Sequence, residues 1–164
     1  MNIVLIGMMG CGKSVVGKNL SENLSYNFID TDNLIENKYG KISEIFSNKG
    51  EKYFRKLETK IIKSISKTDK TIISTGGGIV LNEKNILYLK RNATIFYLKA
   101  KPETLFMRTK GSERPLLQTG GLEKINEILE KRTSLYEKYS NFTITTDDRK
   151  ILEIVEEIRL KIME

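Results

Sequence analysis

The sequence predicts an α/β fold with a five-stranded parallel sheet flanked by helices. Short apolar segments, typical of buried strands, alternate with longer segments whose apolar residues recur at helical spacing. The first apolar segment ends directly at a glycine-rich loop, and a helical segment follows that loop. The length of 164 residues suits one domain that buries a core without metal or disulfide cross-links. We therefore expect a single domain over residues 1–164.

The expected strands are short and apolar. Residues 3–6 form a continuous apolar run, which is typical of a strand buried on both faces of a parallel sheet. The second strand, residues 27–30, ends in Asp-Thr-Asp, and the third, residues 71–75, ends in three glycines. Two further strands are expected at residues 94–98 and 142–145.

The expected helices lie between these strands. We expect helices at residues 13–24, at 102–107 with Pro102 in the first turn, and at 122–139. Residues 33–66 should be mostly helical, with breaks near Gly40 and Gly50. A closing helix is predicted by an apolar stripe at Ile151, Ile154, Val155, Ile158 and Ile162. Residues 109–121 contain three glycines and a proline with little periodicity, so we expect a mobile loop there.

Composition excludes several classes of function. The chain has no histidine, which excludes Ser-His-Asp and Cys-His nucleophiles and every His-ligated metal site. The net charge of +7 is spread along the chain, so we expect no nucleic-acid partner. No segment is long and apolar enough for a membrane span, and the short apolar start reads as a strand rather than a signal peptide. One cysteine permits no internal disulfide, which is compatible with a cytoplasmic location.

The glycine-rich loop has the spacing Gly7-x4-Gly12-Lys13-Ser14, the P-loop signature. Its glycines let backbone N–H groups surround a phosphate, and the following helix presents its positive end to the same anion. Lys13 should bridge the β- and γ-phosphates of a nucleotide, and the Ser14 hydroxyl should coordinate Mg²⁺. Cys11 lies inside the loop, so we expect its alkylation to inactivate the protein and ATP to protect it.

Ligands of open α/β sheets bind outside the carboxyl ends of the strands. Three apolar strands end in polar or glycine motifs, at Gly7, at residues 30–32 and at residues 76–78. A parallel sheet would collect all three beside the phosphates, where Asp30 and Asp32 could support Mg²⁺ and orient an attacking hydroxyl. The alternative for either aspartate is a purely structural role as a helix N-cap, and Asp32 could cap a helix that starts at residue 33.

Six motifs in a fixed order span nearly the whole chain. They are residues 7–14, Asp30-Thr31-Asp32, Phe54-Arg55-x-x-Glu58, Ser74-Thr75-Gly76-Gly77-Gly78, Arg114-Pro115-Leu116-Leu117 and Arg132-x-x-Leu135-Tyr136. This combination resembles the shikimate kinase family, which has the three-layer P-loop fold of the nucleoside-monophosphate-kinase-like proteins. The resemblance implies substrate-binding helices at about residues 33–60 and a mobile lid at about residues 109–121.

The resemblance also implies an activity. Members of the family transfer phosphate from ATP to the 3-hydroxyl of shikimate, on the way to chorismate and the aromatic amino acids. ATP would be the co-substrate, with one Mg²⁺ per subunit held by Ser14 and with Asp30 and Asp32 in the outer shell. The implied protein is a cytoplasmic kinase, expected as a monomer, that binds shikimate and ATP but no nucleic acid and no membrane.

Roles follow by position in the motifs. The implied catalytic residues are Lys13, Asp32 and Arg114. The implied ATP-binding residues are Gly10, Cys11, Gly12, Lys13, Ser14, Val15, Arg108, which would stack on adenine, and Arg114. The implied shikimate-binding residues are Asp32, Arg55, Gly76, Gly77, Gly78 and Arg132, with Phe46 and Phe54 as walls of the pocket. Planar guanidinium groups at Arg55 and Arg132 suit the shikimate carboxylate, and Glu58 should pair with Arg55 at i,i+3 spacing.

Two other functions remain compatible with parts of this pattern. The first is a kinase of the same fold that acts on gluconate or a nucleoside monophosphate. The second is a nucleotide-binding or nucleic-acid-binding module without catalytic activity.

Overall fold

The computed structural model describes residues 1–111 and 120–163 of the chain. Five parallel strands form one sheet in the order β2-β3-β1-β4-β5. The strands are β1 (Asn2–Ile6), β2 (Asn27–Asp30), β3 (Thr71–Ser74), β4 (Ala93–Lys99) and β5 (Phe142–Thr145). The expected five-stranded parallel sheet is confirmed.

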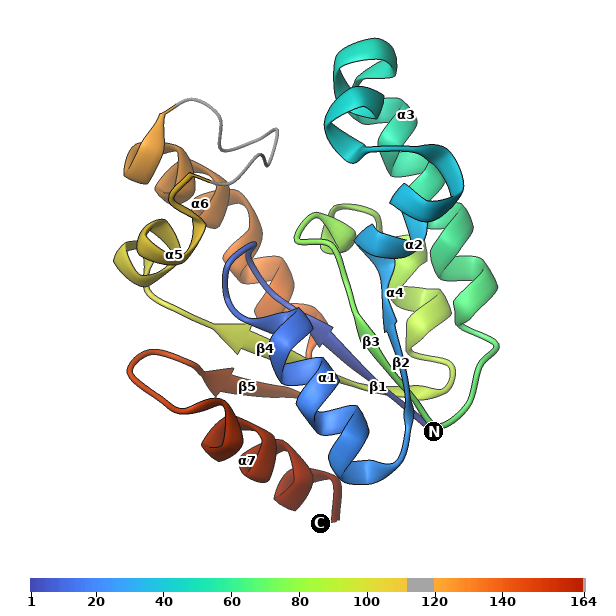
Figure 1. Cartoon of the computed structure of the whole chain (residues 1–164), viewed down its shortest axis with the longest axis vertical. Helices are drawn as coiled ribbons and strands as arrows, with labels where there is room; N and C mark the ends of the chain where they lie inside the picture. Colours follow the sequence, from blue (N-terminus) through green and yellow to red (C-terminus); the bar gives the residue numbers. More distant parts are fainter. Residues whose placement is uncertain (112–119, 164) are drawn as a thin grey trace.

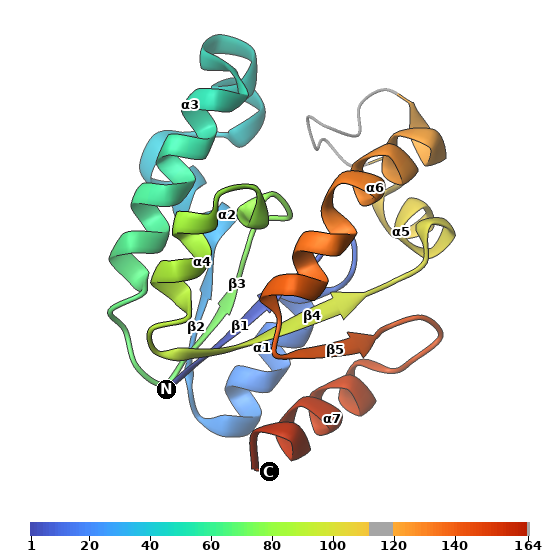
Figure 2. The ribbon, with the colours of Figure 1, turned by 180° about the vertical axis from the view of Figure 1, so that it is seen from behind.

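Helices cover both faces of this sheet, which gives three layers (Figures 1 and 2). The helices are α1 (Lys13–Leu24), α2 (Thr31–Tyr39), α3 (Ile42–Ile65), α4 (Glu83–Leu89), α5 (Pro102–Thr109), α6 (Gly121–Tyr139) and α7 (Ile151–Met163), with a 3₁₀ turn, η1, at Ile79–Leu81. Helices α1 and α7 lie side by side on one face, and α3, α4 and α6 lie on the other (Figures 1 and 2). Within the described ranges, no helix has the length and hydropathy of a membrane span.

The central strand β1 explains why the sheet is buried on both sides. Ile3 and Leu5 pack into the apolar cluster beneath α1 and α7, whereas Val4 and Ile6 pack into the cluster beneath α3 and α4. Successive side chains of a strand point to opposite faces, so a continuous apolar run fills two cores at once. Because β1 is the central strand, the loop that follows it lies at the middle of the edge formed by the carboxyl ends of the strands.

Most element positions agree with the sequence, and two details differ. The breaks expected near Gly40 and Gly50 are confirmed, because Gly40 is the C-cap that ends α2 and Gly50 has a non-helical φ of 80° within α3. The suggestion that Asp32 caps a helix is wrong. Asp30 is the N-cap of α2, and its carboxylate accepts from the N–H groups of Asp32 and Asn33.

The segment between β3 and β4 contains two elements that the apolar spacing did not reveal, η1 and α4. Helix α4 has only seven residues, which is too short for a helical stripe to develop. Its clearest local signal is Asn82, whose side chain caps the helix by accepting from the N–H of Lys84.

Candidate active site

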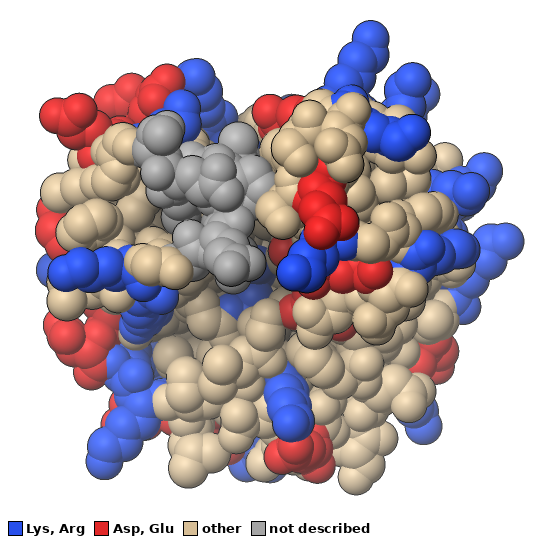
Figure 3. Space-filling view, turned by 45° about the horizontal axis from the view of Figure 1, so that its top comes forward, with Lys and Arg blue, Asp and Glu red and all other residues tan. Residues whose placement is uncertain are grey.

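The loops that follow β1, β2 and β3 meet at one edge of the sheet, because these strands are parallel and adjacent (Figure 1). They border a cleft of about 280 Å³. Its lining residues are Gly10, Gly12, Lys13, Ser14, Val15, Asp30, Asp32, Thr75, Gly77 and Arg108. Figure 3 shows that basic and acidic side chains border a hollow on this face. Three strand ends that are far apart in the sequence therefore contribute to one site.

The P-loop leads directly into α1. Gly12 is the N-cap of α1 with a left-handed φ of 99°, a conformation that costs glycine little. The Lys13 side chain folds back over the loop, and its Nζ donates to the carbonyls of Gly7 (2.8 Å) and Met8 (3.0 Å). Since the first N–H groups of a helix have no helical acceptor, Lys13 and the start of α1 together present positive charge to an anion.

Cys11 occupies the interior of this loop. Its side chain is only 1% exposed, and its Sγ lies 3.6 Å from the Lys13 Nζ. A thiol reagent can therefore reach the sulfur only if the loop moves. The expected reactivity of Cys11 must be slow for this reason.

A small group of oxygen atoms lies where α1 meets β2. The Ser14 hydroxyl donates to Asp30 Oδ2 at 2.5 Å. The Ser74 hydroxyl lies 3.4 Å from the Ser14 hydroxyl. Magnesium prefers oxygen ligands and is often held by one or two protein groups together with substrate phosphates. No cluster of three or more acidic, cysteine or histidine side chains suited to a metal was found in residues 1–111 and 120–163. The oxygens of Ser14 and Asp30 fit a Mg²⁺ that is bound chiefly through a nucleotide.

Arg55, on α3, lies against the triple-glycine segment. Its Nη1 donates to both carboxylate oxygens of Glu58, at 3.1 and 3.2 Å, and its Nη2 donates to Glu51 at 3.1 Å. The predicted i,i+3 pair is confirmed. A Cβ atom on Gly78 would lie 2.3 Å from both terminal nitrogens of Arg55. Glycine is therefore required at position 78 for the guanidinium to lie here.

Arg132, on α6, reaches the same glycines from the other side. Its side chain is 4% exposed, and its Nη1 lies 3.5 Å from the position of a Cβ on Gly77. Among the described residues, this Nη1 and the Nε of Arg55 are buried without a hydrogen-bond acceptor. Buried charged donors are almost always paired. Two arginines with unused donors therefore indicate a binding site for an anionic group.

Two carboxylates flank Gly76. Oδ1 of Asp32 and Oε2 of Glu58 lie 2.8 and 2.9 Å from the position of a Cβ on this glycine. Burial raises the pKa of Glu58, and the charge of Asp32 adds to this, while Arg55 and Arg132 oppose it. Asp32 lines the cleft together with Lys13, so it lies on the side of the nucleotide loop.

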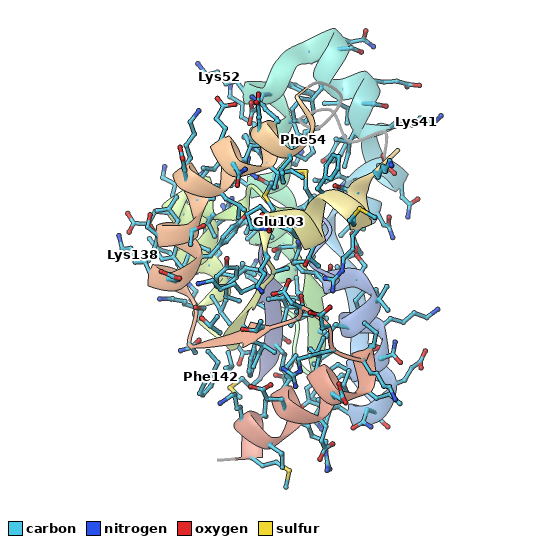
Figure 4. All side chains as sticks on the ribbon, turned by 90° about the vertical axis from the view of Figure 1, so that its left-hand side faces the viewer. Lys41, Lys52, Phe54, Glu103, Lys138 and Phe142 are labelled. Atoms are coloured by element: carbon cyan, nitrogen blue, oxygen red, sulfur yellow. The ribbon has the colours of Figure 1, made fainter. Side chains whose placement is uncertain are left out.

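Phe46 and Phe54 form a tilted pair on α3, with ring centroids 5.0 Å apart. The guanidinium of Arg55 lies 5.1 Å from the Phe54 ring centroid. Figure 4 shows Phe54 among the inner side chains, whereas Lys52 and Lys138 extend outward. Neither phenylalanine lines the described cleft. Their place is beside the arginine rather than beside the P-loop.

Arg108 lines the cleft at its other end. It donates to the hydroxyl and carbonyl of Thr146, each at 3.1 Å, and its Nη1 lies 3.5 Å from the carbonyls of Gly10 and Cys11. It therefore links the P-loop to the segment after β5. The other predicted nucleotide arginine, Arg114, lies outside the described residues, as does most of the expected lid at 109–121.

The structure adds residues to which the sequence assigned no role. Thr75 lines the cleft, and its hydroxyl donates to the carbonyl of Leu5 at 2.9 Å. The Thr31 hydroxyl accepts from the N–H of Gly76 at 3.0 Å. Tyr136 donates to the carbonyl of Gly77 at 2.6 Å. All three lie within the motifs quoted above, which was the available signal, but their contacts are long-range.

Known proteins are similar to this chain in sequence and in fold. The family model described as shikimate kinase matches residues 9–163. Relatives named shikimate kinase include those of Caldanaerobacter subterraneus subsp. tengcongensis and Thermodesulfovibrio yellowstonii. Each is 45% identical over 160 residues, or 96% of this chain, and the matches cover 93% and 92% of those proteins.

A solved structure gives the same result. The shikimate kinase from Acinetobacter baumannii, in complex with shikimate, superposes with a TM-score of 0.95 at 34% identity, over 99% of this chain and 92% of that one. The family model covers nearly the whole chain, the relatives match at high identity, and a half-buried and a buried arginine converge beside a P-loop. The chain belongs to the shikimate kinase family.

Proposed function

We propose that this protein transfers the γ-phosphoryl group of ATP to the 3-hydroxyl of shikimate, which gives shikimate 3-phosphate and ADP on the way to chorismate and the aromatic amino acids. The observation that carries the proposal is the convergence of Arg55 and Arg132 on the triple glycine next to the P-loop. Planar guanidinium groups recognise carboxylates by paired hydrogen bonds. Shikimate combines one carboxylate with ring hydroxyls, which matches this site.

The nucleotide end of the site is built from the P-loop. Gly10, Cys11, Gly12 and Val15 would surround the phosphates, and Arg108 would lie beside the base. On nucleotide binding, Lys13 would exchange its carbonyl partners in the loop for phosphate oxygens. Ser14 would hold Mg²⁺, with Asp30 and Asp32 in its outer shell. The bound metal supplies charge neutralisation of the phosphates.

The acceptor end is built from α3, α6 and the glycines. Arg55 and Arg132 would hold the carboxylate, so that the ring lies along Gly76, Gly77 and Gly78. Asp32 would then accept a hydrogen bond from the 3-hydroxyl and direct its oxygen towards the γ-phosphorus. Phe46 and Phe54 would form walls of the substrate pocket, with the Phe54 ring against the guanidinium of Arg55. Arg114 would supply a second positive charge to the transferring group, as its motif position implies.

A coupled assay of ADP release tests the proposal. We expect turnover with shikimate and at least about a hundredfold less with gluconate, deoxyadenosine or AMP at equal concentration. Deoxyadenosine and AMP have no carboxylate for the two arginines, and gluconate has one but lacks the rigid ring that would hold its hydroxyls in place. Phosphorus NMR of the product should show a phosphate monoester on the 3-oxygen. Preferred turnover of gluconate or a nucleotide would replace this proposal with the corresponding kinase of the same fold.

We further propose a cytoplasmic monomer that binds neither nucleic acid nor membranes. Sedimentation equilibrium measures its mass in solution. A salt-sensitive gel shift with RNA, combined with no turnover of shikimate, would instead support the alternative of a binding module.

A further inference from the structure

Tyr136 lies on α6 one helical turn after Arg132, and its hydroxyl donates to the carbonyl of Gly77 at 2.6 Å. This distance is at the short end for a hydrogen bond between two oxygens. The side chain is fully buried. The contact joins residues that are 59 positions apart, so it fixes α6 to the triple-glycine segment.

The ring of Tyr136 is held rigidly. It stacks on Tyr97 of β4, with centroids 5.0 Å apart and an interplanar angle of 24°. Burial raises the pKa of Tyr136 well above its usual value, although the charge of Arg132 opposes this. The hydroxyl therefore remains a proton donor at every pH at which the enzyme is assayed, and its direction is set by the stacked rings.

The hydrogen bond orients a peptide group. The Gly77–Gly78 peptide is trans, so the Gly77 carbonyl and the Gly78 N–H point in opposite directions. Because the carbonyl faces Tyr136, the N–H faces away from α6. Within the described residues, neither Gly77 nor Gly78 donates its N–H to a backbone or side-chain acceptor. A peptide whose carbonyl accepts a strong hydrogen bond is also a better donor at its N–H.

We propose that Tyr136 is a positioning residue for the acceptor substrate: its hydroxyl fixes the Gly77–Gly78 peptide so that the Gly78 N–H donates to a ring hydroxyl of shikimate. This inference rests on the proposed function. The guanidinium of Arg55 occupies the space that a Cβ on Gly78 would fill, and Arg132 lies near the corresponding position on Gly77, so carboxylate binding and hydroxyl binding would share one short segment. Rotation of this peptide would remove the N–H donor and disturb the site of both guanidinium groups.

The first test compares two tyrosines of the same stacked pair. Tyr136→Phe keeps the ring and removes only the hydroxyl that binds Gly77. Tyr97→Phe is the matched control, because it also removes a buried hydroxyl, one that faces Thr133 rather than the glycines. We expect Tyr136→Phe to raise the KM for shikimate about three- to tenfold, as the loss of one hydrogen bond would. The KM for ATP in both variants, and the KM for shikimate in Tyr97→Phe, should stay within about twofold of the original.

The result would overturn the proposal if Tyr136→Phe left the KM for shikimate unchanged, or raised the KM values for shikimate and ATP equally. Equal changes would indicate a general loosening of the fold, so thermal unfolding of both variants is recorded alongside the kinetics.

The second test needs no variant and no turnover. Nitrogen-15-labelled protein is titrated with shikimate in the absence of ATP. We expect the resonance of the Gly78 amide proton to shift downfield as this N–H donates to the ligand. The Tyr136 hydroxyl proton should give a slowly exchanging signal from a position close in space to the Gly77–Gly78 peptide. A Gly78 amide that does not respond to bound shikimate overturns the inference, even if Tyr136→Phe does not fold. A protein that does not bind shikimate at all would instead overturn the proposed function.

Discussion

Nη1 of Arg55 donates to both carboxylate oxygens of Glu58, at 3.1 and 3.2 Å. Glu58 lies one helical turn after Arg55 on α3 and is 1% exposed, so its carboxylate is a buried anchor for a half-buried cation. The pair holds the guanidinium against Gly78 before any substrate arrives. Pre-ordered groups lose less conformational entropy on binding, which favours tight recognition of the carboxylate.

The raised pKa of Glu58 predicts a dependence of stability on pH. The folded state binds this proton at higher pH than the unfolded chain, whose glutamates titrate near 4.5. The stability from the protonated carboxyl is therefore fully present below the unfolded pKa and is lost as pH rises through the folded pKa. We therefore compare the free energy of unfolding of the original protein with that of Glu58→Gln. We expect the advantage of the original protein over the variant to increase as pH falls from about 7 toward 4.5.

Urea unfolding at a series of pH values measures this difference. Glu51→Gln is the control, because Glu51 also contacts Arg55 but is 47% exposed. A difference for Glu58→Gln that stays constant or decreases toward low pH would contradict the prediction.

Truncation of Arg55 should weaken shikimate binding specifically. We expect Arg55→Ala to raise the KM for shikimate by a factor that corresponds to about 2–5 kcal/mol of binding free energy. The substitution removes a partner of a charged ligand in a desolvated site. The KM for ATP should change little. Arg91→Ala is a suitable control, since Arg91 also lies over an aromatic ring, that of Tyr88, but at the surface. An unchanged KM for shikimate in Arg55→Ala would show that the carboxylate binds elsewhere.

A methyl group on Gly78 should have a similar effect by a different route. The added Cβ would lie 2.3 Å from both terminal nitrogens of Arg55, so the guanidinium must move. We expect Gly78→Ala to raise the KM for shikimate by about tenfold or more while the protein still folds. Gly40→Ala is the control: it has a positive φ of 94° and nothing within 4 Å, so it should lower stability without altering the KM. Equal kinetics in Gly78→Ala and the original protein would argue against a close approach.

Lys13 and Arg114 should act mainly on the chemical step. Loss of one donor to the charge of a transition state typically costs about 3–4 kcal/mol, or about 10²–10³-fold in rate. We expect decreases of this size in kcat for Lys13→Ala and for Arg114→Ala, measured by ADP release. Lys18→Ala changes an exposed lysine on the same helix and should be close to neutral. Near-normal turnover in both variants would refute their catalytic roles.

Cys11 should react slowly with thiol reagents. Its burial means that modification requires movement of the P-loop, and bound nucleotide restrains that movement. We expect slow loss of activity with iodoacetamide and further protection by ATP. Rapid labelling, comparable to that of a free small thiol, would show that the loop opens readily; equal rates with and without ATP would show that Cys11 does not contact the nucleotide.

Local patterns predicted most of the elements. The continuous apolar run at β1 and the glycine that follows it are adjacent in the chain, as are the residues of the P-loop, so the sequence displays them directly. The sequence left the N-cap open between Asp30 and Asp32 because both are good capping residues. Only the backbone geometry decides between them, and it selects Asp30. Helix α4 was missed because seven residues carry too few turns for a periodic signal.

The sequence by itself determined that the chain has a P-loop, two aspartates after the second strand, and arginines in motifs that resemble one family. Only the tertiary structure decided that Arg55 and Arg132 approach one short glycine segment from α3 and α6, and that Tyr136 holds the carbonyl of Gly77. Spacing along a chain encodes the periods of helices and strands. Contacts between residues 59 positions apart depend on how whole helices pack across a sheet, which no local pattern records.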